Sequence, residues 1–429
     1  MTTRLIQFGG RPVLLFHSEA RHYGRFAIEL LLSLIEARDR KASLFILTGS
    51  PVVPDGLLQL DSPDVQVLRP GGLRRAALKA RWNVGEVSHR VLSWPGGVAY
   101  AVRDELAIEL RRYVSAQNSR PEVRAVLRRW QNSLKSANAT NDSRWSPIYS
   151  RHLLRQRVPV RLSDAVLPSV RKSAEAHGIA PEAPLVTIHA SEGGTPSEIG
   201  ERKLNARDDT ARNAQIASYF QAVDALVALG YTVVRIGDAS MTPVSRPGLI
   251  DLATSPSRTS ALEVHCLLRS TFLLSGEGGP PLAAHVTNTP TLLVNVTDPL
   301  ASYPIRDDGL FIMKRVIERE TDRPIDIDEL LSVEYQRSLR NTTRYAYYSN
   351  SPEEIAEAVR EMLAGLKQGW RETPPQQLFR KRIEDAAEAM CAHLRHVGPW
   401  RLEAGFSGTG RIGAAFLAQR WPEAWQAAS

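Results

Sequence analysis

Between Leu185 and Val296, short apolar runs alternate with helical segments, and this alternation is the feature that most limits the possible folds. The runs Leu185–Ile188, Tyr231–Ile236 and Phe272–Leu274 have the length and composition of buried strands. Strands that alternate with helices favour a parallel α/β sheet. Because ligands of such sheets bind beyond the carboxyl ends of the strands, we predict a Rossmann-like unit here with a site at that edge.

The loop Ser275–Gly279, which reads SGEGG, follows one of these strands, and Pro280-Pro281 opens an alanine-rich helix behind it. Glycines let a ligand approach the backbone closely, and a helix N-terminus offers free N–H groups and partial positive charge. The loop is neither a P-loop nor a GxGxxG turn. It predicts a phosphate or diphosphate site, with a tight turn that merely needs glycine as the alternative.

A second set of apolar runs lies near the N-terminus. Pro12–Phe16, Ala42–Leu47 and Val65–Leu68 read as strands, and an amphipathic helix beginning near Phe26 separates the first two. The loop His17–Arg25 follows the first strand, so it should also lie at a carboxyl edge. Two histidines and a glutamate make it the best source of acid/base groups in this half, although each could be an ordinary surface residue.

Charge and cysteine content narrow the class of protein. Among 429 residues, Lys+Arg 54 against Asp+Glu 46 leave a net charge of +8, with many arginines between Arg69 and Arg161. That excess favours an anionic partner, such as a nucleotide or a phospholipid surface. Two cysteines cannot form a disulfide framework, and we see no signal peptide or membrane span, so we expect a cytoplasmic protein.

At this point a family resemblance can be identified. The chain resembles a bacterial family of GT-B glycosyltransferases, and more distantly heptosyltransferases and O-fucosyltransferases. The resemblance covers residues 185–296 best. It departs at Ala190 and Ser191, where the fucosyltransferase pattern has an arginine soon after the histidine, and at the unusual Glu277. The matching residues are His189, Arg212-Asn213, Tyr219, Gly230–Gly237, Ile250–Ala253, Ser275-Gly276, Pro290 and Val294-Asn295, with His22–Ala27 and Gly410–Gly413 in the flanks.

The resemblance implies two Rossmann-like domains facing across a cleft. Residues 1–165 would form the acceptor-side domain, and residues 166–370 the nucleotide-sugar-binding domain. Helices of residues 371–429 would pack back on the N-terminal domain. It further implies transfer of a sugar from a nucleotide-sugar donor to a glycan, lipid-linked or small-molecule acceptor, with neither a metal nor a cofactor. The nucleotide sugar would be a co-substrate.

Roles for individual residues follow from this reading. A departing nucleoside diphosphate gains negative charge, which basic groups and helix N-termini must neutralise. An acceptor hydroxyl needs a base within hydrogen-bond reach if transfer is inverting, and needs none if it is retaining. Catalytic candidates are Glu19, His17 and His22; donor-binding candidates are His189, Arg202, Lys203, Arg235, Asp238, Ser275, Gly276, Glu277 and Gly278.

Other functions stay open at this level. The same fold supports nucleotide-sugar epimerases, and the departure after His189 would also suit a non-catalytic nucleotide-sugar-binding partner protein. Net charge alone suggests nucleic-acid binding, but no recognisable nucleic-acid-binding motif is present, so we expect no specific nucleic acid. The arginine-rich N-terminal half could instead contact the inner face of a membrane. Asp326-Ile327-Asp328 resembles a metal signature, but it precedes a helix and is most simply its cap.

Overall fold

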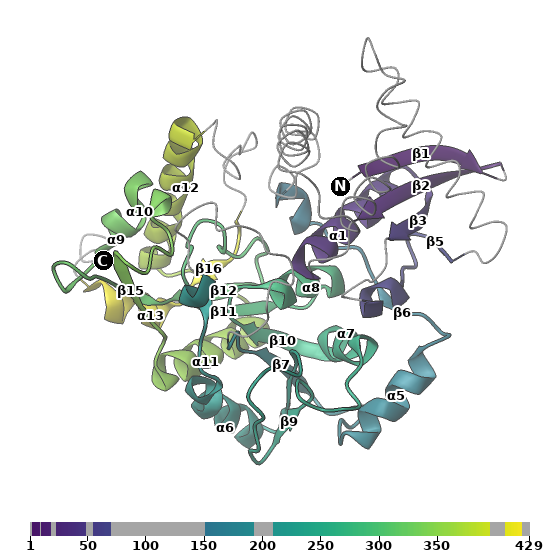
Figure 1. Cartoon of the computed structure of the whole chain (residues 1–429), viewed down its shortest axis with the longest axis horizontal. Helices are drawn as coiled ribbons and strands as arrows, with labels where there is room; N and C mark the ends of the chain where they lie inside the picture. Colours follow the sequence, from purple (N-terminus) through teal and green to yellow (C-terminus); the bar gives the residue numbers. More distant parts are fainter. Residues whose placement is uncertain are drawn as a thin grey trace, which may run out of the picture.

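The computed structural model describes residues 2–8, 10–18, 23–48, 55–69, 151–192, 209–394 and 408–422. Two sheets with flanking helices confirm the predicted α/β class (Figure 1). Residues 98–114 and 121–134, whose sequence also predicts helices, lie outside the described residues, as does most of the arginine-rich region.

The N-terminal unit contains a four-stranded sheet in the order β1-β2-β3-β5. Its strands are β1 (Thr2–Phe8), β2 (Arg11–Ser18), β3 (Ser43–Thr48) and β5 (Val67–Leu68). Strands β2, β3 and β5 are parallel, and α1 (Tyr23–Asp39) connects β2 to β3, as the sequence predicted. The edge strand β1 runs antiparallel to β2 and was not predicted, because it begins with the polar and charged residues Thr2, Thr3 and Arg4 and has only a short apolar run.

The second unit is built on a seven-stranded sheet whose neighbouring strands all pair in parallel. The chain starts at β7, moves outward through β8 to β9, then returns to the other side of β7 and continues outward from β10. Two neighbouring strands, β7 and β10, therefore flank the switch point of a doubly wound sheet. The order is β16 (Arg411–Ile412), β12 (Leu310–Met313), β11 (Thr291–Val296), β10 (Ser270–Ser275), β7 (Leu185–His189), β8 (Thr232–Arg235) and β9 (Leu249–Asp251).

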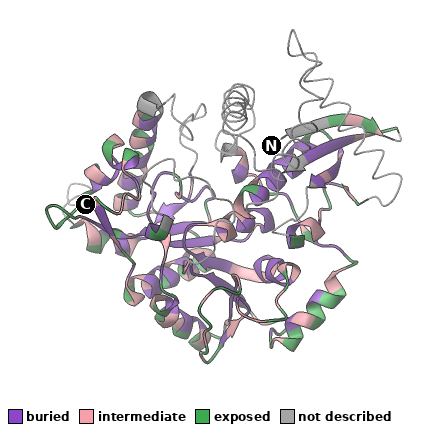
Figure 2. Cartoon of the chain, viewed as in Figure 1, coloured by how far each residue is buried: buried purple, intermediate pink, exposed green. Residues whose placement is uncertain are grey.

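Both faces of this sheet are covered, which is why its strands are nearly continuous apolar runs (Figure 2). Along β10, Phe272 and Leu274 point into one apolar cluster, and Leu273 points into the other. The first cluster includes residues of α6 (Phe220–Ala228), α11 (Pro352–Gln368) and α12 (Pro374–Leu394); the second includes residues of α5 (Leu167–Ala176), α7 (Ser260–Arg269) and α8 (Gly279–Thr287). This second cluster continues into α1 and β2, so the two units share one core.

Predicted helix caps are present. The Ser351 hydroxyl accepts from the Glu354 amide at the start of α11. The Glu354 carboxylate in turn accepts a hydrogen bond from the Ser351 amide. Asp326 caps α9 (Ile327–Leu330) by accepting from the Glu329 amide at 2.8 Å. The remaining short elements are α10 (Val333–Arg337), α13 (Ala414–Arg420), β4 (Leu60–Asp61), β6 (Arg161–Leu162), β13 (Arg315–Glu318), β14 (Arg323–Pro324) and β15 (Tyr345–Tyr348), with 3₁₀ turns at Asp55–Gln59, Arg151–Arg155, Asp209–Arg212 and Ile216–Tyr219.

The described part of the C-terminal segment packs on the second unit. Residues 371–429 were expected to pack back on the N-terminal domain. In the described part of this segment, Phe379 and Ile383 of α12 and Phe416 of α13 lie in the core of the second unit, and β16 extends the large sheet. Helix α12 contacts α10, α13 and β16, and the ring of Phe379 lies 6.1 Å from that of Phe311 in β12. The domain boundaries themselves stay a prediction.

The first turns of α1 and α8 are in close contact. A Cβ atom built on Gly24 would lie 2.7 Å from Leu282 Cδ1, and one built on Gly279 would lie 2.8 Å from Tyr23 Cδ1. Side chains at these two glycines would therefore force the helices apart (Figure 1). Because α1 follows β2 and α8 follows β10, this contact joins the carboxyl ends of the two sheets.

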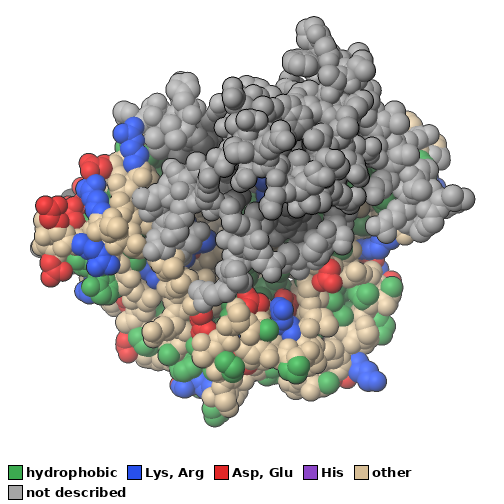
Figure 3. All heavy atoms as spheres, viewed as in Figure 1, with side chains coloured by type: hydrophobic (Ala, Val, Ile, Leu, Met, Phe, Trp, Pro, Cys, Tyr) green, Lys and Arg blue, Asp and Glu red, His purple; other side chains and the backbone are tan. Residues whose placement is uncertain are grey.

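Within the described residues, no helix combines the length and apolarity needed to cross a bilayer. At the left of Figure 3, acidic and basic side chains are intermixed on the described surface rather than separated by sign. Cytoplasmic location and contact with a membrane face stay predictions.

Candidate functional site

The switch point of the large sheet brings two predicted site residues together. Ser275 ends β10 and is paired in register with His189, which ends β7. The Ser275 hydroxyl lies 3.3 Å from His189 Nδ1, and the Gly276 amide donates to the His189 carbonyl at 3.4 Å. The predicted glycine loop thus begins directly beside the predicted histidine, in the place where doubly wound sheets bind their ligands.

His189 is a neutral group at physiological pH. Its residue is 8% exposed. Burial lowers the pKa of His189 to about 4, and the charge of Arg235 lowers it further while Asp238 acts in the opposite direction. At neutral pH the ring can therefore donate or accept a hydrogen bond but cannot supply positive charge to a diphosphate.

The helix behind the glycine loop offers fewer donors than the sequence suggested. At Gly276 an added Cβ would meet Val294 O at 3.7 Å and Tyr219 Oη at 3.9 Å, which are ordinary van der Waals distances. Gly278 has φ +154° and precedes the first residue of α8. In the first turn of α8, Pro280 and Pro281 have no N–H, so Gly279 retains the free amide of that turn. Any anion bound here must rely on loop amides and nearby side chains.

Glu277 points away from solvent. The residue is 6% exposed, and both carboxylate oxygens accept hydrogen bonds from the segment that follows β11. Oε1 accepts from the Asp298 amide at 3.1 Å and the Ser302 hydroxyl at 2.7 Å. Oε2 accepts from the Thr297 hydroxyl at 2.6 Å and lies 3.3 Å from Arg340 Nη2. This carboxylate is therefore occupied within the protein.

The described contacts of the Arg235 side chain are likewise with other groups of the protein. Its side chain is fully buried at the end of β8, where Nη2 lies 3.0 Å from Glu192 and Nη1 lies 3.3 Å from Asp251. Nη1 also donates to the Thr242 carbonyl at 2.7 Å. Glu192 in turn accepts from the amides of Ile216 and Thr242, so this cluster fixes the start of the long polar segment that begins after His189. The predicted donor contact of Arg235 stays a prediction; its described contacts are internal.

Asp238 follows β8 and forms a local turn. Its carboxylate accepts from the Ser240 amide at 2.8 Å and from the Ser240 hydroxyl at 2.5 Å. The neighbouring Gly237 amide donates to Glu263, a buried residue of α7, at 3.3 Å. Burial raises the pKa of Glu263, and the adjacent Arg258 opposes that shift. Asp238 thus lies on the β8 side of the same edge as His189.

Several predicted residues fall outside the described part of the chain. Glu19, His22, Arg202 and Lys203 belong to this group, and for His17 the structure describes the backbone at the end of β2 but not the side chain. Tyr23, the first described residue after Glu19 and His22, touches Gly279 of the glycine loop. Chain connectivity therefore brings the end of the predicted acid/base loop to α8.

Lys314 is a candidate that sequence reasoning missed. It directly follows β12, and its residue is 5% exposed. Nζ donates to the Asn213 carbonyl at 2.5 Å, which ties the residue after the 3₁₀ turn Asp209–Arg212 to the sheet. Burial lowers the pKa of Lys314 to about 8, and the charge of Glu277 opposes this shift. The available signal was a cation placed immediately after the buried run Leu310–Met313, at the same edge as the other candidates.

A metal site is not evident in the described ranges, where no group of three or more His, Cys, Asp or Glu side chains is placed to hold an ion. Asp326 acts as a helix cap, and Asp307 and Asp308 lie within ion-pair distance of Arg157. Metal independence stays a prediction, because part of the chain is not described.

Neither a protein-family profile nor a curated protein matches the chain. Solved structures that resemble it include a glycosyl transferase family 9 protein from Veillonella parvula, with 12% identity over 82% of this chain and 96% of that chain and a TM-score of 0.37. The ADP-heptose LPS heptosyltransferase II of E. coli shows 12% identity over 83% and 98%, with a TM-score of 0.40.

A Listeria monocytogenes protein assigned as a UDP-N-acetylglucosamine 2-epimerase shows 12% identity over 84% of this chain and 97% of that chain, with a TM-score of 0.26. The first two names agree with the GT-B glycosyltransferase resemblance found in the sequence. At such low identities and scores, none of these likenesses carries weight for the activity of this chain, which must be inferred from its own residues.

Proposed function

We propose that the protein is a glycosyltransferase that moves a sugar from a nucleotide-sugar donor to a glycan, lipid-linked or small-molecule acceptor. The observation that carries the proposal is the pairing of His189 with the Ser275-Gly276 loop at the switch point of the large sheet. The contact between α1 and α8 adds support, because it joins this point to the carboxyl end of the other sheet.

In this proposal the donor diphosphate lies along the edge from β7 to β12. The Ser275 hydroxyl, the Gly279 amide and the Lys314 ammonium would receive it, with neutral His189 as a hydrogen-bond partner. As the glycosidic bond breaks, negative charge grows on the departing diphosphate, and donors already oriented toward it stabilise that charge without rearranging. Arg202 and Lys203, which belong to the polar segment 191–209, are proposed to contribute further positive charge to the diphosphate site. No metal is required in this scheme.

The first test is a titration of the purified protein with ADP, GDP, UDP, CDP and dTDP, followed by assays with sugar conjugates of the diphosphate that binds best. We expect binding of at least one diphosphate, then release of that diphosphate together with a new glycoside. An epimerase would instead yield an isomerised sugar without a glycoside. If no diphosphate binds, the proposal is wrong.

The acceptor side is tested through kinetics. Glu19→Gln or His22→Ala should lower kcat by about 10²- to 10⁴-fold with little change in donor affinity, as expected for a general base. Arg202→Ala and Lys203→Ala should weaken donor binding as well as the chemical step. If the Glu19 and His22 variants affected donor binding alone, the base would have to be sought elsewhere.

A further inference from the structure

The proposed diphosphate loop contains a carboxylate, and this calls for an explanation. Glu277 lies between Gly276 and Gly278, where a free negative charge would repel an anionic ligand. The structure turns this side chain inward, to 6% exposure for the whole residue, and gives it four hydrogen-bond donors. A buried carboxylate of this kind persists only if its charge is paired.

Arg340 provides the pairing charge. Its side chain is 13% exposed; Nη2 lies 3.3 Å from Glu277, and Nε donates to the Thr297 hydroxyl at 2.9 Å. Arg340 also has φ +59°, a left-handed conformation that non-glycine residues seldom adopt. The Arg340 amide donates to the Tyr347 hydroxyl at 2.8 Å, and this hydrogen bond stabilises the left-handed backbone conformation. A strained backbone that directs a guanidinium to a loop carboxylate is typical of a functional site.

The hydroxyls around the pair complete a tether. Thr297 donates to Glu277 and accepts from Arg340, so it bridges the two charged groups. Ser302 and the Asp298 amide hold the other carboxylate oxygen. Through these bonds the residue between the two loop glycines is fixed to the segment after β11, on the β12 side of the loop.

We propose that Glu277 and Arg340 are positioning residues of the donor site: the Glu277 carboxylate anchors the glycine loop, and Arg340 neutralises that carboxylate so that the loop can accept a diphosphate. The inference rests on the proposed function. It replaces a direct donor contact for Glu277 with an internal role, and it assigns a role to Arg340 that the sequence did not suggest.

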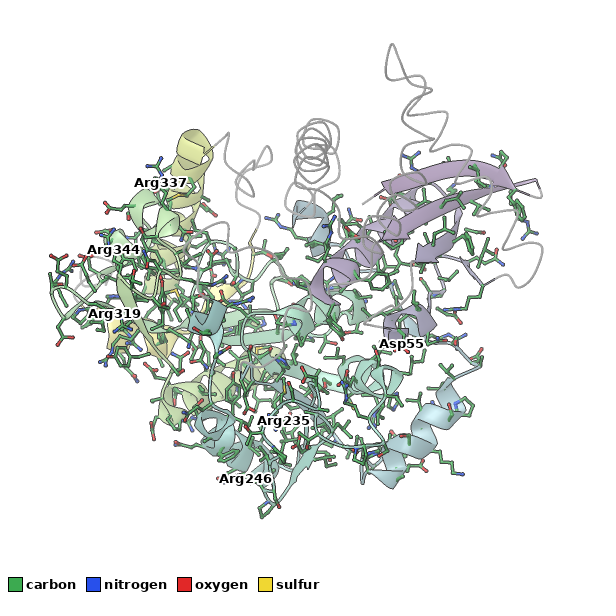
Figure 4. The ribbon with its side chains drawn as sticks, in the orientation of Figure 1. Asp55, Arg235, Arg246, Arg319, Arg337 and Arg344 are labelled. Carbon is green, nitrogen blue, oxygen red and sulfur yellow. The ribbon has the colours of Figure 1, made fainter. Side chains whose placement is uncertain are left out.

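The test uses inorganic pyrophosphate and the diphosphate that binds best to the full chain, titrated into five proteins. These are the wild type, Glu277→Gln, Arg340→Met, the double variant, and the control Arg337→Met. Arg337 lies three residues earlier, on the exposed part of α10 (Figure 4), so its removal should leave binding unchanged.

We expect Arg340→Met to weaken pyrophosphate binding by about tenfold or more, because it leaves an unpaired negative charge beneath the loop. The double variant should recover most of the lost affinity, since glutamine removes the charge while its amide oxygen can still accept from the Asp298 amide and the Ser302 hydroxyl and its NH2 group can donate to the Thr297 hydroxyl. Glu277→Gln alone should bind pyrophosphate at least as tightly as the wild type. Rescue by a second substitution would not follow from a merely structural role, and melting temperatures of all five proteins separate stability from binding.

Three results would overturn the inference. Arg340→Met could bind like the wild type, or the double variant could bind as weakly as Arg340→Met. Alternatively, Glu277→Gln could lose affinity for the nucleoside diphosphate but not for pyrophosphate, which would show that the carboxylate contacts the nucleoside. If Arg340→Met does not fold, the Glu277→Gln result decides. A wild type that binds neither probe would refute the proposed function itself, a result distinct from these three.

Discussion

Two buried ion pairs lie at opposite ends of the same sheet edge, and they are built differently. After β8, Arg235 lies between Glu192 and Asp251, so three buried charges leave one negative charge in excess. Toward β12, Glu277 pairs with Arg340, and the charge of Glu277 also acts on Lys314. Among the described residues, Lys314 donates its one hydrogen bond to a neutral carbonyl.

The difference indicates which end of the edge suits an anion. The Arg235 cluster satisfies its cation with carboxylates and cross-links the chain, so it offers little to a diphosphate. The β10–β12 end has the glycine loop and, among the described residues, an ammonium without a carboxylate at hydrogen-bond distance. We therefore expect the Arg235 cluster to govern stability and the Lys314 end to govern anion binding.

The largest expected effect is on stability. Arg235→Met should lower the free energy of unfolding by about 3–5 kcal/mol, because it leaves Glu192 and Asp251 buried without their shared cation. The control Arg246→Met removes an arginine at the outer edge of the same unit (Figure 4), where its partner Asp224 is exposed, and should change stability by about 1 kcal/mol or less. Chemical denaturation measures both. Equal losses would contradict the contrast.

Acid stability should depend on His189, which lies between the two ends. Its folded pKa of about 4 is below the unfolded value of 6.5, so the folded state takes up the proton less readily. Its contribution is therefore fully favourable above pH 6.5 and is lost as the pH falls toward 4, at a cost of up to about 3 kcal/mol. The variant His189→Asn should reduce this acid sensitivity relative to wild type, as measured by denaturation at pH 7 and pH 4.5. Burial also lowers the pKa of His265 to about 4, so His265 should account for the acid sensitivity that remains in this variant.

Lys314→Met should weaken binding of the best nucleoside diphosphate by about 10- to 100-fold, the usual effect of losing one charged hydrogen bond. Stability should not fall by a similar amount, because the substitution also removes the cost of burying an ammonium group. Lys367→Met, at an exposed position in the last turn of α11, serves as the matched control. An unfolded Lys314→Met protein, or one with normal affinity, would count against this assignment.

The smallest expected effect is that of chelation. Activity should survive EDTA, since neither end of the edge is proposed to hold a metal. Loss of activity with EDTA and recovery with manganese would reveal a metal site, and Asp208, Asp209, Asp307 and Asp308 would be the first residues to test.

The sequence predicted the strands of the large sheet well, because strands buried on both faces are continuous apolar runs with clear ends. The apolar periodicity of Ala211–Leu229 predicts one helix, but the first half of this segment forms two 3₁₀ turns, and α6 covers Phe220–Ala228. The apolar periodicity there reflects burial of Ile216 and Tyr219 under the sheet, which 3₁₀ turns achieve as well as a helix does.

The side-chain contacts at the site were harder to predict, for a physical reason. Arg235 and Glu277 looked like ligand contacts because each is a charged residue at the end of a strand. Their partners are distant in sequence: Glu192 lies 43 residues before Arg235, and Arg340 lies 63 residues after Glu277. Only the parallel sheet brings these groups together, and a single sequence contains no local pattern that records the pairing.

The most direct test of the central claim is calorimetric titration of the best nucleoside diphosphate into the wild type, Gly276→Ala and Gly276→Val. An alanine Cβ fits at this position, where the nearest atom is 3.7 Å away, so Gly276→Ala should melt at a temperature similar to the wild type, and the melting temperature of Gly276→Val is measured alongside it. Gly278 is unsuitable for this test, because its φ of +154° strains any other residue. If the diphosphate binds over the loop, affinity should fall from glycine to alanine and fall further to valine. Equal affinity in three folded proteins would contradict the placement of the donor at the switch point between β7 and β10.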